Sequence, residues 1–483
     1  MNNRMVFYVI GKILISIGAV MALPLGVTVF YGENFLNFLI PMAVCLAAGF
    51  LLSIKKPQNT RLLPRDGFVA VGLSWIVISV AGALPYILAG TFSNPVDAFF
   101  ESVSGFSTTG ATVLLDIEAQ DKGILIWRSL TQWLGGMGVL VFLLAILPKS
   151  DNNSSRFMHL MKAEVTGPTV GKLVARISQT ARVLYGFYIA LTLIEFILLA
   201  FGEMTIFEAL AHSLSTAGTG GFGVKNDSFM SYSAYSQYVV AIFMLLFGIN
   251  TSVFFLMITG HFLRALKNEE LRWYLGIIAF CTLFIGITIF SSIGTVEGSF
   301  RTAFFQVCSI ITTAGFVTAD FELWPNFTHI LIILLMFCGG CAGSTAGGMK
   351  ISRLLLLFKN GRREIRYIQH PRAVMSVKVD GKTVDHETIR GTTSYIITFA
   401  GLFVISTVLV MAIENCDILT GLSSVATSLN NVGPALGDVG PTDTFEPLHW
   451  GSKLILCFNM LAGRLELFPI LMLLSPSTWK KFS

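Results

Sequence analysis

Residues Asp97–Thr112 read DAFFESVSGFSTTGAT, and this short stretch decides how the rest of the chain is interpreted. It is moderately apolar, it is too short to cross a bilayer, and it ends in a Thr-Thr-Gly sequence that disfavours further helix. Three other segments of the 483-residue chain repeat its pattern: FEALAHSLSTAGTGGFG at 207–223, RTAFFQVCSIITTAGF at 301–316 and LTGLSSVATSLNNVGP at 419–434. The chain therefore contains four copies of one short unit.

The four copies align without gaps on one glycine each, namely Gly110, Gly221, Gly315 and Gly433. Twelve residues earlier each copy has a small residue: Ala98, Ala209, Ala303 and Gly421. Six residues earlier each has a hydroxyl: Ser104, Ser215, Ser309 and Thr427. Two residues earlier each has a polar side chain: Thr108, Thr219, Thr313 and Asn431. One such segment would be a weak signal, but a fourfold pattern at fixed offsets indicates a true repeat.

The composition indicates that the chain lies in a membrane. Hydrophobic residues make up 54% of it, charged residues only 13%, and the mean hydropathy is +0.72. A soluble domain would have about 25% charged residues. The net charge of +5 does not indicate binding to nucleic acid, because a membrane protein places its basic residues according to its orientation.

About ten segments are long and apolar enough to cross the hydrocarbon region as helices. They lie near 8–30, 35–54, 67–90, 125–147, 182–202, 236–260, 273–293, 328–358, 391–413 and 450–475. The first has no clear small-x-small cleavage site, so we interpret it as a retained helix rather than a signal peptide. The eighth contains a glycine-rich break.

The distribution of lysine and arginine predicts the orientation. One set of loops holds most of the basic residues: Lys55, Lys56, Arg61, Arg65, Lys149, Arg156, Lys162, Lys172, Arg176, Arg264, Lys267, Arg272, those of 359–390, Lys480 and Lys481. The opposite loops are mostly acidic: Glu33, Asp116, Glu118, Asp121, Asp227 and Glu322. We therefore expect a multi-pass protein with both termini in the cytoplasm and the four short units reaching in from outside.

Each unit predicts a short helix that enters from outside and a Thr-Gly segment that returns in extended conformation. Non-helical backbone at membrane depth must be buried in protein or line water, and four copies around one axis meet that condition together. Their carbonyls can then replace the hydration shell of a cation, and the helix C-termini favour a cation at the centre. We predict an all-α polytopic membrane protein with four tandem helix–pore loop–helix repeats in pseudo-fourfold arrangement, plus two extra N-terminal transmembrane helices.

This interpretation divides the chain into five parts. We expect an N-terminal two-helix domain at 1–66, repeat 1 at 67–177, repeat 2 at 178–270, repeat 3 at 271–387 and repeat 4 at 388–483.

The glycine-rich stretch CGGCAGSTAGGMK, Cys338–Lys350, interrupts the second helix of repeat 3. A phosphate-binding P-loop is excluded, because Met349 stands where that motif requires lysine. So dense a run of glycine is a poor helix, and its backbone must face water or protein. We interpret it as a movable plug below the four loops, and the alternative is a close helix crossing between small residues.

These residues resemble the TrkH/KtrB/HKT superfamily of potassium transport proteins over essentially the whole chain. The loops STTGAT, TGGFG, TTAGF and NNVGP resemble the family's four filter segments, GGCAGSTAGGMK its intramembrane gating loop, and LAGRLELF its last pore-lining helix. The two spans before the first repeat are similar to the N-terminal domain of the TrkH-type members.

The resemblance implies potassium as the ion. It implies a filter built from Thr108, Thr109, Gly110, Thr219, Gly220, Gly221, Thr312, Thr313, Ala314, Gly315, Asn430, Asn431, Val432 and Gly433. The expected K⁺ ligands are the backbone carbonyls of Thr108, Thr109, Thr219, Gly220, Thr313, Ala314, Asn431 and Val432. Related plant proteins that favour sodium have serine where this chain has Gly110, but its loops differ from the highly selective TVGYG signature, so we expect modest preference for K⁺ over Na⁺.

The resemblance also implies a gate. It would comprise Gly339, Gly340, Gly343, Gly347, Gly348, Lys350 and Arg464. Arg464 lies about ten residues, roughly 15 Å of helix, from the cytoplasmic end, which is too deep for easy snorkelling. Glu466 is two residues away on the helix and is not expected to be its direct partner. Lys350 has a second interpretation, as a positive anchor at the cytoplasmic surface.

The family further implies partners. We expect a homodimer in the bacterial inner membrane, in contact with lipid, with a cytosolic TrkA-like regulatory ring that binds nucleotide. The charged segment 360–390 could dock that ring or be an ordinary positive-inside loop. This chain has no nucleotide motif, and no cofactor is expected apart from K⁺ ions in the filter.

Several residues and functions stay open at this point. Asp97 and Glu101 could attract cations or favour the first short helix's N-terminus, and His212 fits a buried structural imidazole. An alternative function is a secondary transporter that couples Na⁺ or H⁺ to a solute, although such sites usually come from two broken-helix repeats. An enzyme is not expected, because the spans hold neither a catalytic cluster nor haem-ligand histidines.

Overall fold

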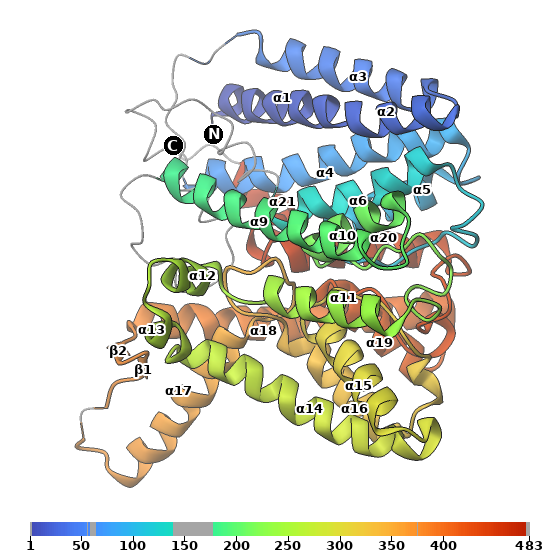
Figure 1. Ribbon diagram of the computed structural model, residues 1–483. Coiled ribbons are helices and arrows are strands. Elements are labelled where there is room, and N and C mark those ends of the chain that lie inside the picture. The colour runs from blue at the N-terminus through green and yellow to red at the C-terminus, as the bar shows by residue number, and fades with distance from the viewer. Residues whose placement is uncertain (1, 56, 58–63, 139–176, 374, 480–483) are drawn as a thin grey trace.

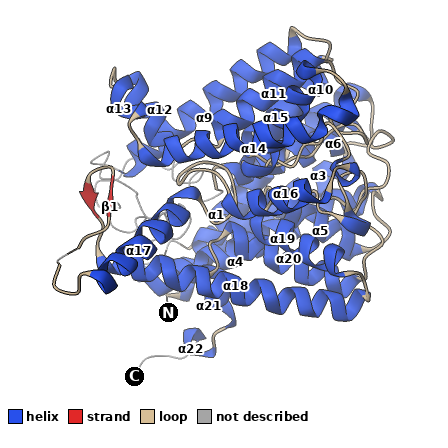
Figure 2. Cartoon of the chain, turned by 90° about the horizontal axis from the view of Figure 1, so that it is seen from below, coloured by secondary structure: helices blue, strands red, loops and turns tan. Residues whose placement is uncertain are grey.

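The computed structural model is almost entirely helical (Figure 1, Figure 2). It describes all residues except 1, 56, 58–63, 139–176, 374 and 480–483. The second half of the expected fourth span, 125–147, and the basic residues of 149–176 lie outside the described residues, as do Lys56, Arg61, Lys480 and Lys481. Most helices run along a common direction, and both termini lie at one end of the bundle (Figure 1).

The first two predicted spans form a separate layer at the edge of the bundle (Figure 1). α1 (Asn3–Val20) and α2 (Ala22–Tyr31) make one nearly continuous span, and α3 (Leu36–Ser53) packs against α1. A Cβ on Gly11 would lie 2.8 Å from the Gly49 carbonyl oxygen, so these two helices cross backbone to backbone. Close crossings between small residues are a common way for helices to associate in lipid.

The rest of the chain repeats one unit four times, as predicted. The first helices are long and apolar: α4 (Pro64–Ala89), α9 (Ile177–Ala200), α14 (Glu269–Ile293) and α18 (His386–Glu414). The short helices are α5 (Pro95–Phe106), α10 (Ile206–Gly218), α15 (Val296–Ile311) and α19 (Ile418–Asn430). The second helices are α6 (Lys122–Gly136), α11 (Ala234–Phe247), α16 (Asn326–Cys338) and α20 (Trp450–Arg464).

All four short helices begin at a side-chain cap. Asn94, Thr205, Thr295 and Asp417 each accept a hydrogen bond from a backbone N–H of the first turn. Thr205 and Glu208 complete a capping box. Such caps fix where a helix starts, each contributing about 1 kcal/mol. Because the starts are fixed, the C-terminal ends of the four helices are held at the loops that follow them.

The second helices correct one prediction. We expected continuous spans at 236–260 and 450–475, but α11 bends by 96° into α12 (Thr251–Ile258), and α20 ends three residues before α21 (Phe468–Leu474). Consecutive positive φ angles at Glu466 and Leu467 make the second break. α16 is separated from α17 (Ile351–Gln369) by the predicted glycine-rich loop.

The breaks explain why few helices qualify as spans. Six helices of the described chain are long and apolar enough to cross a membrane, or seven if the bent pair α11–α12 is one span. Five of the six are α1–α2, α3, α4, α14 and α18 over nearly their whole length, and the sixth is the 183–200 part of α9. The second helices are too short because they stop inside the bundle.

The remaining elements lie between these helices and at the ends of the bundle. A 3₁₀ turn, η1 (Phe321–Leu323), precedes α16, and a second, η2 (Gly437–Val439), precedes α20. α13 (Phe262–Leu266) precedes α14, and α22 (Pro476–Trp479) follows α21. A small antiparallel hairpin of β1 (Lys378–Val379) and β2 (Lys382–Thr383) lies between α17 and α18.

The hairpin is fastened to the third repeat. The Asp380 carboxylate accepts hydrogen bonds of 2.8 Å from the Asn268 amide and from the Glu269 backbone N–H at the start of α14. Lys359 of α17 pairs with Glu269 and donates to the Lys378 carbonyl. The hairpin therefore connects the helix that follows the glycine-rich loop with the first helix of the same repeat.

Candidate ion pathway

The four loops that follow the short helices share one backbone conformation. Two residues before the aligned glycine, φ lies between 52° and 58° in every copy: Thr108, Thr219, Thr313 and Asn431. At the aligned glycine, φ lies between 77° and 106°: Gly110, Gly221, Gly315 and Gly433. Carbonyls alternate in direction along an ordinary strand, and such reversals of φ turn successive carbonyls toward the same side. This is the backbone from which carbonyl-lined ion filters are built.

The four glycines form a closed ring. A Cβ built on Gly110 would lie no more than 2.7 Å from the carbonyl oxygen of Gly220 in the next repeat, a distance that real side chains essentially never show. The same approach joins the other pairs: Gly221 to Ala314, Gly315 to Val432, and Gly433 to Thr109. Each loop therefore meets the next, and the fourth meets the first. Glycine is required at these positions by contact as well as by φ.

Polar side chains join the loops behind the ring. The Asn431 amide donates to the Thr109 hydroxyl over 3.0 Å and to the Met460 carbonyl of α20 over 2.8 Å. The Thr109 hydroxyl also contacts the Ser107 hydroxyl at 2.7 Å. The fourth loop is thus fastened both to the first loop and to its own second helix. Asn431 therefore holds the wall of the ring through its side chain.

The glycine-rich segment 339–350 lies directly against two of these loops. The Gly347 N–H donates to the Thr313 hydroxyl over 2.6 Å, and the Gly348 N–H donates to the Asn430 carbonyl over 3.0 Å. Both partners belong to the predicted filter segments of repeats 3 and 4. The segment is not helical, so the structure rules out the alternative of a continuous helix crossing.

The other side of this segment is held by repeat 2 and by α14. The Cys341 N–H donates to the Gly248 carbonyl at the bend between α11 and α12, and the Thr251 hydroxyl donates to the Gly343 carbonyl. The Ala342 N–H donates to the buried Glu270 carboxylate over 2.6 Å. Many backbone N–H and C=O groups of the segment are therefore hydrogen-bonded to protein groups, as is required of non-helical backbone at membrane depth.

Arg464 connects this segment to the opposite side of the bundle. It is the last residue of α20, and its guanidinium donates to the Thr345 carbonyl over 2.8 Å and to the carbonyls of Gly135 and Gly136. Those two carbonyls end α6, where the helix dipole is negative. One side chain thus bridges repeats 1, 3 and 4 just below the ring.

The neighbouring charges also have partners. Lys350 is only 2% exposed and donates to the Ala346 carbonyl within its own segment, so it is not a surface anchor. Glu466 pairs with Arg353 in the first turn of α17, and the Arg353 guanidinium lies 4.0 Å from the centre of the Tyr395 ring. As expected from helix geometry, the Glu466 pairing is with another repeat.

The arrangement of four loops and an intramembrane segment agrees with the comparison to known families. The TrkH family, described as cation transport proteins, matches residues 34–481. The chain belongs to the TrkH family. It is similar over its full length to the Trk system potassium uptake protein TrkH of Escherichia coli strain K12, with 36% identity over 492 residues and 100% of both chains covered.

Two other TrkH-family proteins show the same relation. The Trk system potassium uptake protein TrkG of E. coli K12 is 33% identical over 473 residues, covering 95% of this chain and 94% of that one. The crystal structure of the potassium transporter TrkH from Vibrio parahaemolyticus superimposes with a TM-score of 0.89 at 32% identity, covering 99% of this chain and 100% of that one. These relatives are named as transport proteins, so the chain belongs to a transporter family and not to an enzyme family.

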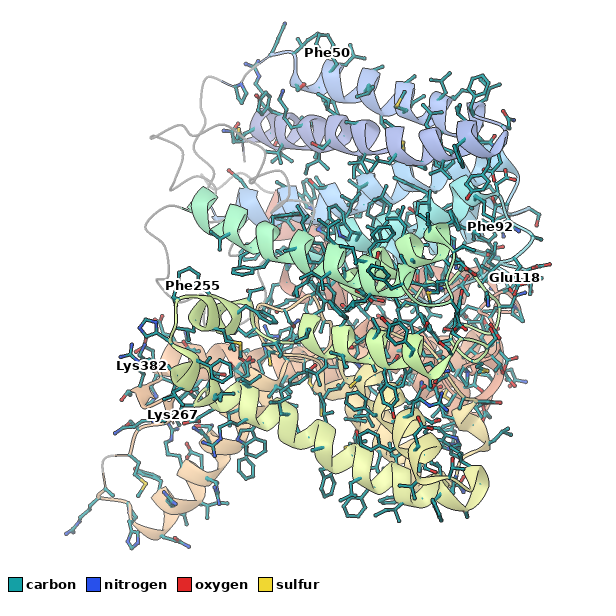
Figure 3. The ribbon with its side chains drawn as sticks, in the orientation of Figure 1. Phe50, Phe92, Glu118, Phe255, Lys267 and Lys382 are labelled. Atoms are coloured by element: carbon teal, nitrogen blue, oxygen red, sulfur yellow. The ribbon has the colours of Figure 1, made fainter. Side chains whose placement is uncertain are left out.

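This TrkH-family chain has a vestibule on the side of the ring away from the segment 339–350. A cavity of about 120 Å³ is lined by all four ring glycines and by the residues that follow them. It is also lined by residues 440–445, Arg128, Lys225 and residues of 114–117 and 226–228. Two of its lining residues, Leu115 and Ile117, stand just before Glu118, which lies at the end of the bundle opposite the termini (Figure 3). An ion that reaches the ring from that side would pass through this vestibule.

The carboxylates left open by the sequence are both in ion pairs. Glu101 and Arg128 are fully buried and form a 2.8 Å pair, and Glu101 also accepts the Thr112 hydroxyl and the Val113 N–H. Asp97 pairs with Lys453 of α20 over 2.6 Å. These acids support the walls of the first and fourth repeats rather than facing the ring as free cation ligands.

Two further titratable groups, His212 and Glu322, have structural partners too. His212 is buried, and its Nε2 lies 3.3 Å from the Tyr232 hydroxyl, as expected for a structural imidazole. Glu322, in η1 before α16, accepts the Gly437 N–H. Burial raises the pKa of the Glu322 carboxyl; the Gly437 hydrogen bond opposes this shift, and the nearby Asp320 and Asp443 carboxylates add to it.

Sequence reasoning missed Gln132 of α6. Its side chain lies against the second loop and bonds to Gly220 and Phe222 of that loop and to Ser215 of α10. The available signal was an irregularity in the repeat: the residue before the ring glycine is Thr109, Ala314 or Val432 in three copies but Gly220 in the second. A glycine where the other copies have a side chain indicates that another residue fills the space.

Proposed function

We propose that this protein takes up potassium ions through the ring of four loops, in the bacterial cytoplasmic membrane. The observation that carries the proposal is the closed ring itself, in which each aligned glycine touches the carbonyl that precedes the next glycine. Rings of backbone carbonyls replace the hydration shell of K⁺. The names of the relatives, which are potassium uptake proteins and a potassium transporter, support this choice of ion.

In this proposal the filter consists of the four predicted segments around the ring. The carbonyls of Thr108, Thr109, Thr219, Gly220, Thr313, Ala314, Asn431 and Val432 are the proposed ligands. Glycine at all four ring positions lets the backbone of each loop meet the next, so that the ring consists of backbone groups. The loops differ from the highly selective TVGYG signature, so we expect a modest preference for K⁺ over Na⁺.

The gate consists of the segment 339–350 together with Arg464. Its support is that Gly347 and Gly348 bond directly to filter residues while Arg464 ties the segment to the end of α6. A segment held in this way closes the path below the ring, and a fixed positive charge there raises the barrier to a cation. For the gate to open, the hydrogen bonds of Gly347, Gly348 and Arg464 must break and be replaced by others.

We further propose how the chain is organised in the cell. It divides into a two-helix domain at 1–66 and repeats at 67–177, 178–270, 271–387 and 388–483, and both termini face the cytoplasm. It forms a homodimer and binds a cytosolic TrkA-like ring, which carries the nucleotide. The hairpin Lys378–Thr383 supports this proposal, because it couples α17, directly after the gate segment, to α14.

The experiment is a reversal-potential measurement in mixed K⁺ and Na⁺ on purified protein in liposomes. We expect Gly110→Ser to lower the K⁺/Na⁺ permeability ratio by roughly tenfold, equivalent to about 1.4 kcal/mol. The reason is that a side chain at φ 81° would meet the Gly220 carbonyl. An unchanged permeability ratio would show that the first loop is not part of the filter.

The matched control is Gly90→Ser. Gly90 also has positive φ, at 67°, but no atom lies within 4 Å of a Cβ built there, and it stands before the first short helix. The same substitution in open space should leave the ratio unchanged. Radiotracer uptake of amino acids by the same liposomes tests the secondary-transporter alternative, and solute-coupled flux would contradict the proposal.

A further inference from the structure

The second loop of the ring lacks a side chain that the other three have. One residue before the ring glycine stands Thr109, Ala314 or Val432 in three copies and Gly220 in the second. A Cβ built on Gly220 would lie within 2.7 Å of Cγ, Cδ and Oε1 of Gln132. The side-chain amide of Gln132 therefore occupies the space that a side chain at position 220 would take.

Both the nitrogen and the oxygen of the Gln132 amide form hydrogen bonds around this loop. Its Nε2 donates to the Gly220 carbonyl over 2.6 Å, and its Oε1 accepts the Phe222 N–H over 3.1 Å and the Ser215 hydroxyl over 2.5 Å. The three partners lie before, within and after the filter segment. Gln132 and Ser215 are completely buried, so water does not replace these bonds.

The first and third loops are held differently. In the third, the Ser309 hydroxyl at the position equivalent to Ser215 bonds to the Phe316 carbonyl of its own loop over 2.6 Å. In the first, the Thr109 side chain itself makes the contacts to Ser107 and Asn431. The second loop has no side chain for this purpose, and its support comes from α6 of the preceding repeat.

We propose that Gln132 is a positioning residue of the second filter segment, and that its amide sets the preference for K⁺ over Na⁺ by fixing the Gly220 carbonyl. The inference rests on the proposed function, because it needs the ring to be the selectivity filter. A filter discriminates ions through the number and placement of its carbonyl dipoles. A carbonyl held by a buried amide keeps its direction when the ion leaves, whereas a free one can turn away.

The test is a double-mutant cycle of Gln132→Ala, Gly220→Ala and the combination, measured as the K⁺/Na⁺ permeability ratio in liposomes. Gln132→Ala should lower the ratio by roughly tenfold, since it removes three buried hydrogen bonds. Gly220→Ala should lower it as well, because the new methyl group collides with Gln132. The double variant should have a higher ratio than either single variant, since the methyl group then fills part of the vacated space.

The matched control is Gln237→Ala. Gln237 is also a buried glutamine on a second helix, and its amide donates to the carbonyls of Phe229 and Tyr232 over 2.9 and 3.1 Å. The Gln237→Ala variant loses comparable buried hydrogen bonds that do not involve a filter segment, so its K⁺/Na⁺ permeability ratio should stay at the wild-type value. If Gln132→Ala behaves like Gln237→Ala, or if the two filter substitutions combine additively, the inference is wrong.

A second readout covers variants that are too unstable for flux measurements. An ion that binds only the folded filter raises the thermal midpoint, so K⁺ minus Na⁺ stabilisation in detergent reports the same preference. Gln132→Ala should lose that difference and Gln237→Ala should keep it; equal differences in both would overturn the inference. A wild type without K⁺ flux would instead refute the proposed function, so the two failures are distinguishable.

Discussion

The Glu101–Arg128 pair shows how a single residue supports the pathway. Both side chains are at most 1% exposed, and the Arg128 guanidinium lies 4.1 Å from the centre of the Phe222 ring and donates to the Gly223 carbonyl. The pair therefore joins the first short helix to the backbone that follows the second ring glycine. The attraction between two such buried charges offsets their desolvation cost only while both are present, so the loss of one leaves the other buried and uncompensated.

We predict that Arg128→Met destabilises the protein by about 3–5 kcal/mol, because it leaves the Glu101 carboxylate buried without its partner. The double variant Glu101→Gln/Arg128→Met should recover most of that loss, since no charge remains buried. Thermal unfolding of the detergent-solubilised protein, followed by tryptophan fluorescence, compares the midpoints. Equal midpoints for the single and double variants would show that the pair's charges do not matter to stability.

At this scale the ring residues could be predicted and their supports could not. Gly110 and Thr108 were recognisable because four copies place the same residue types at the same offsets, and both have positive φ in the structure. Gln132 was not recognisable, because it stands in one repeat and fills a gap in another. Repeat patterns identify what the copies share, whereas compensation for a difference between copies depends on three-dimensional contact.

At the scale of elements, the second helices decide what lies below the ring. The break at residues 339–350 was predictable, because dense glycine cannot sustain a helix. The bend between α11 and α12 was not, because the apolar run 236–260 continues through it and the Gly248–Asn250 turn is short. Asn250 caps α12 through its own side chain, which was the available signal.

We predict that Arg464→Ala increases K⁺ flux in the absence of any regulatory partner by about tenfold or more. The substitution removes a positive charge from the cation's path and frees the Thr345, Gly135 and Gly136 carbonyls that hold the gate segment. Flux of a K⁺ tracer into liposomes that contain only this chain is the measurement.

The control for Arg464 is Arg272→Ala, which removes an exposed arginine near the start of α14. It lowers the net charge by the same amount and should leave the flux at the wild-type level. If Arg464→Ala conducts no faster than Arg272→Ala, the guanidinium is not part of the barrier, and the segment 339–350 closes the path without it.

At the scale of the whole molecule, the two ends of the bundle differ in chemistry as the distribution of charge predicted. Glu118 lies at one end, and Lys267 and Lys382 lie at the other, together with the chain termini (Figure 3, Figure 1). All three side chains are exposed. Since basic residues are retained on the cytoplasmic side during insertion, the lysine end should be the cytoplasmic one.

We predict that cysteines introduced at these positions react from opposite sides of the membrane. The seven natural cysteines are free and are buried or half-buried, and the half-buried Cys416 is replaced by serine to lower the background. In intact cells a membrane-impermeant maleimide should label Glu118→Cys fully and leave Lys267→Cys and Lys382→Cys unlabelled. After permeabilisation all three should react. Labelling of the two lysine positions in intact cells would show that the protein has the opposite orientation. The vestibule above the four glycines would then open to the cytoplasm instead of receiving ions from outside.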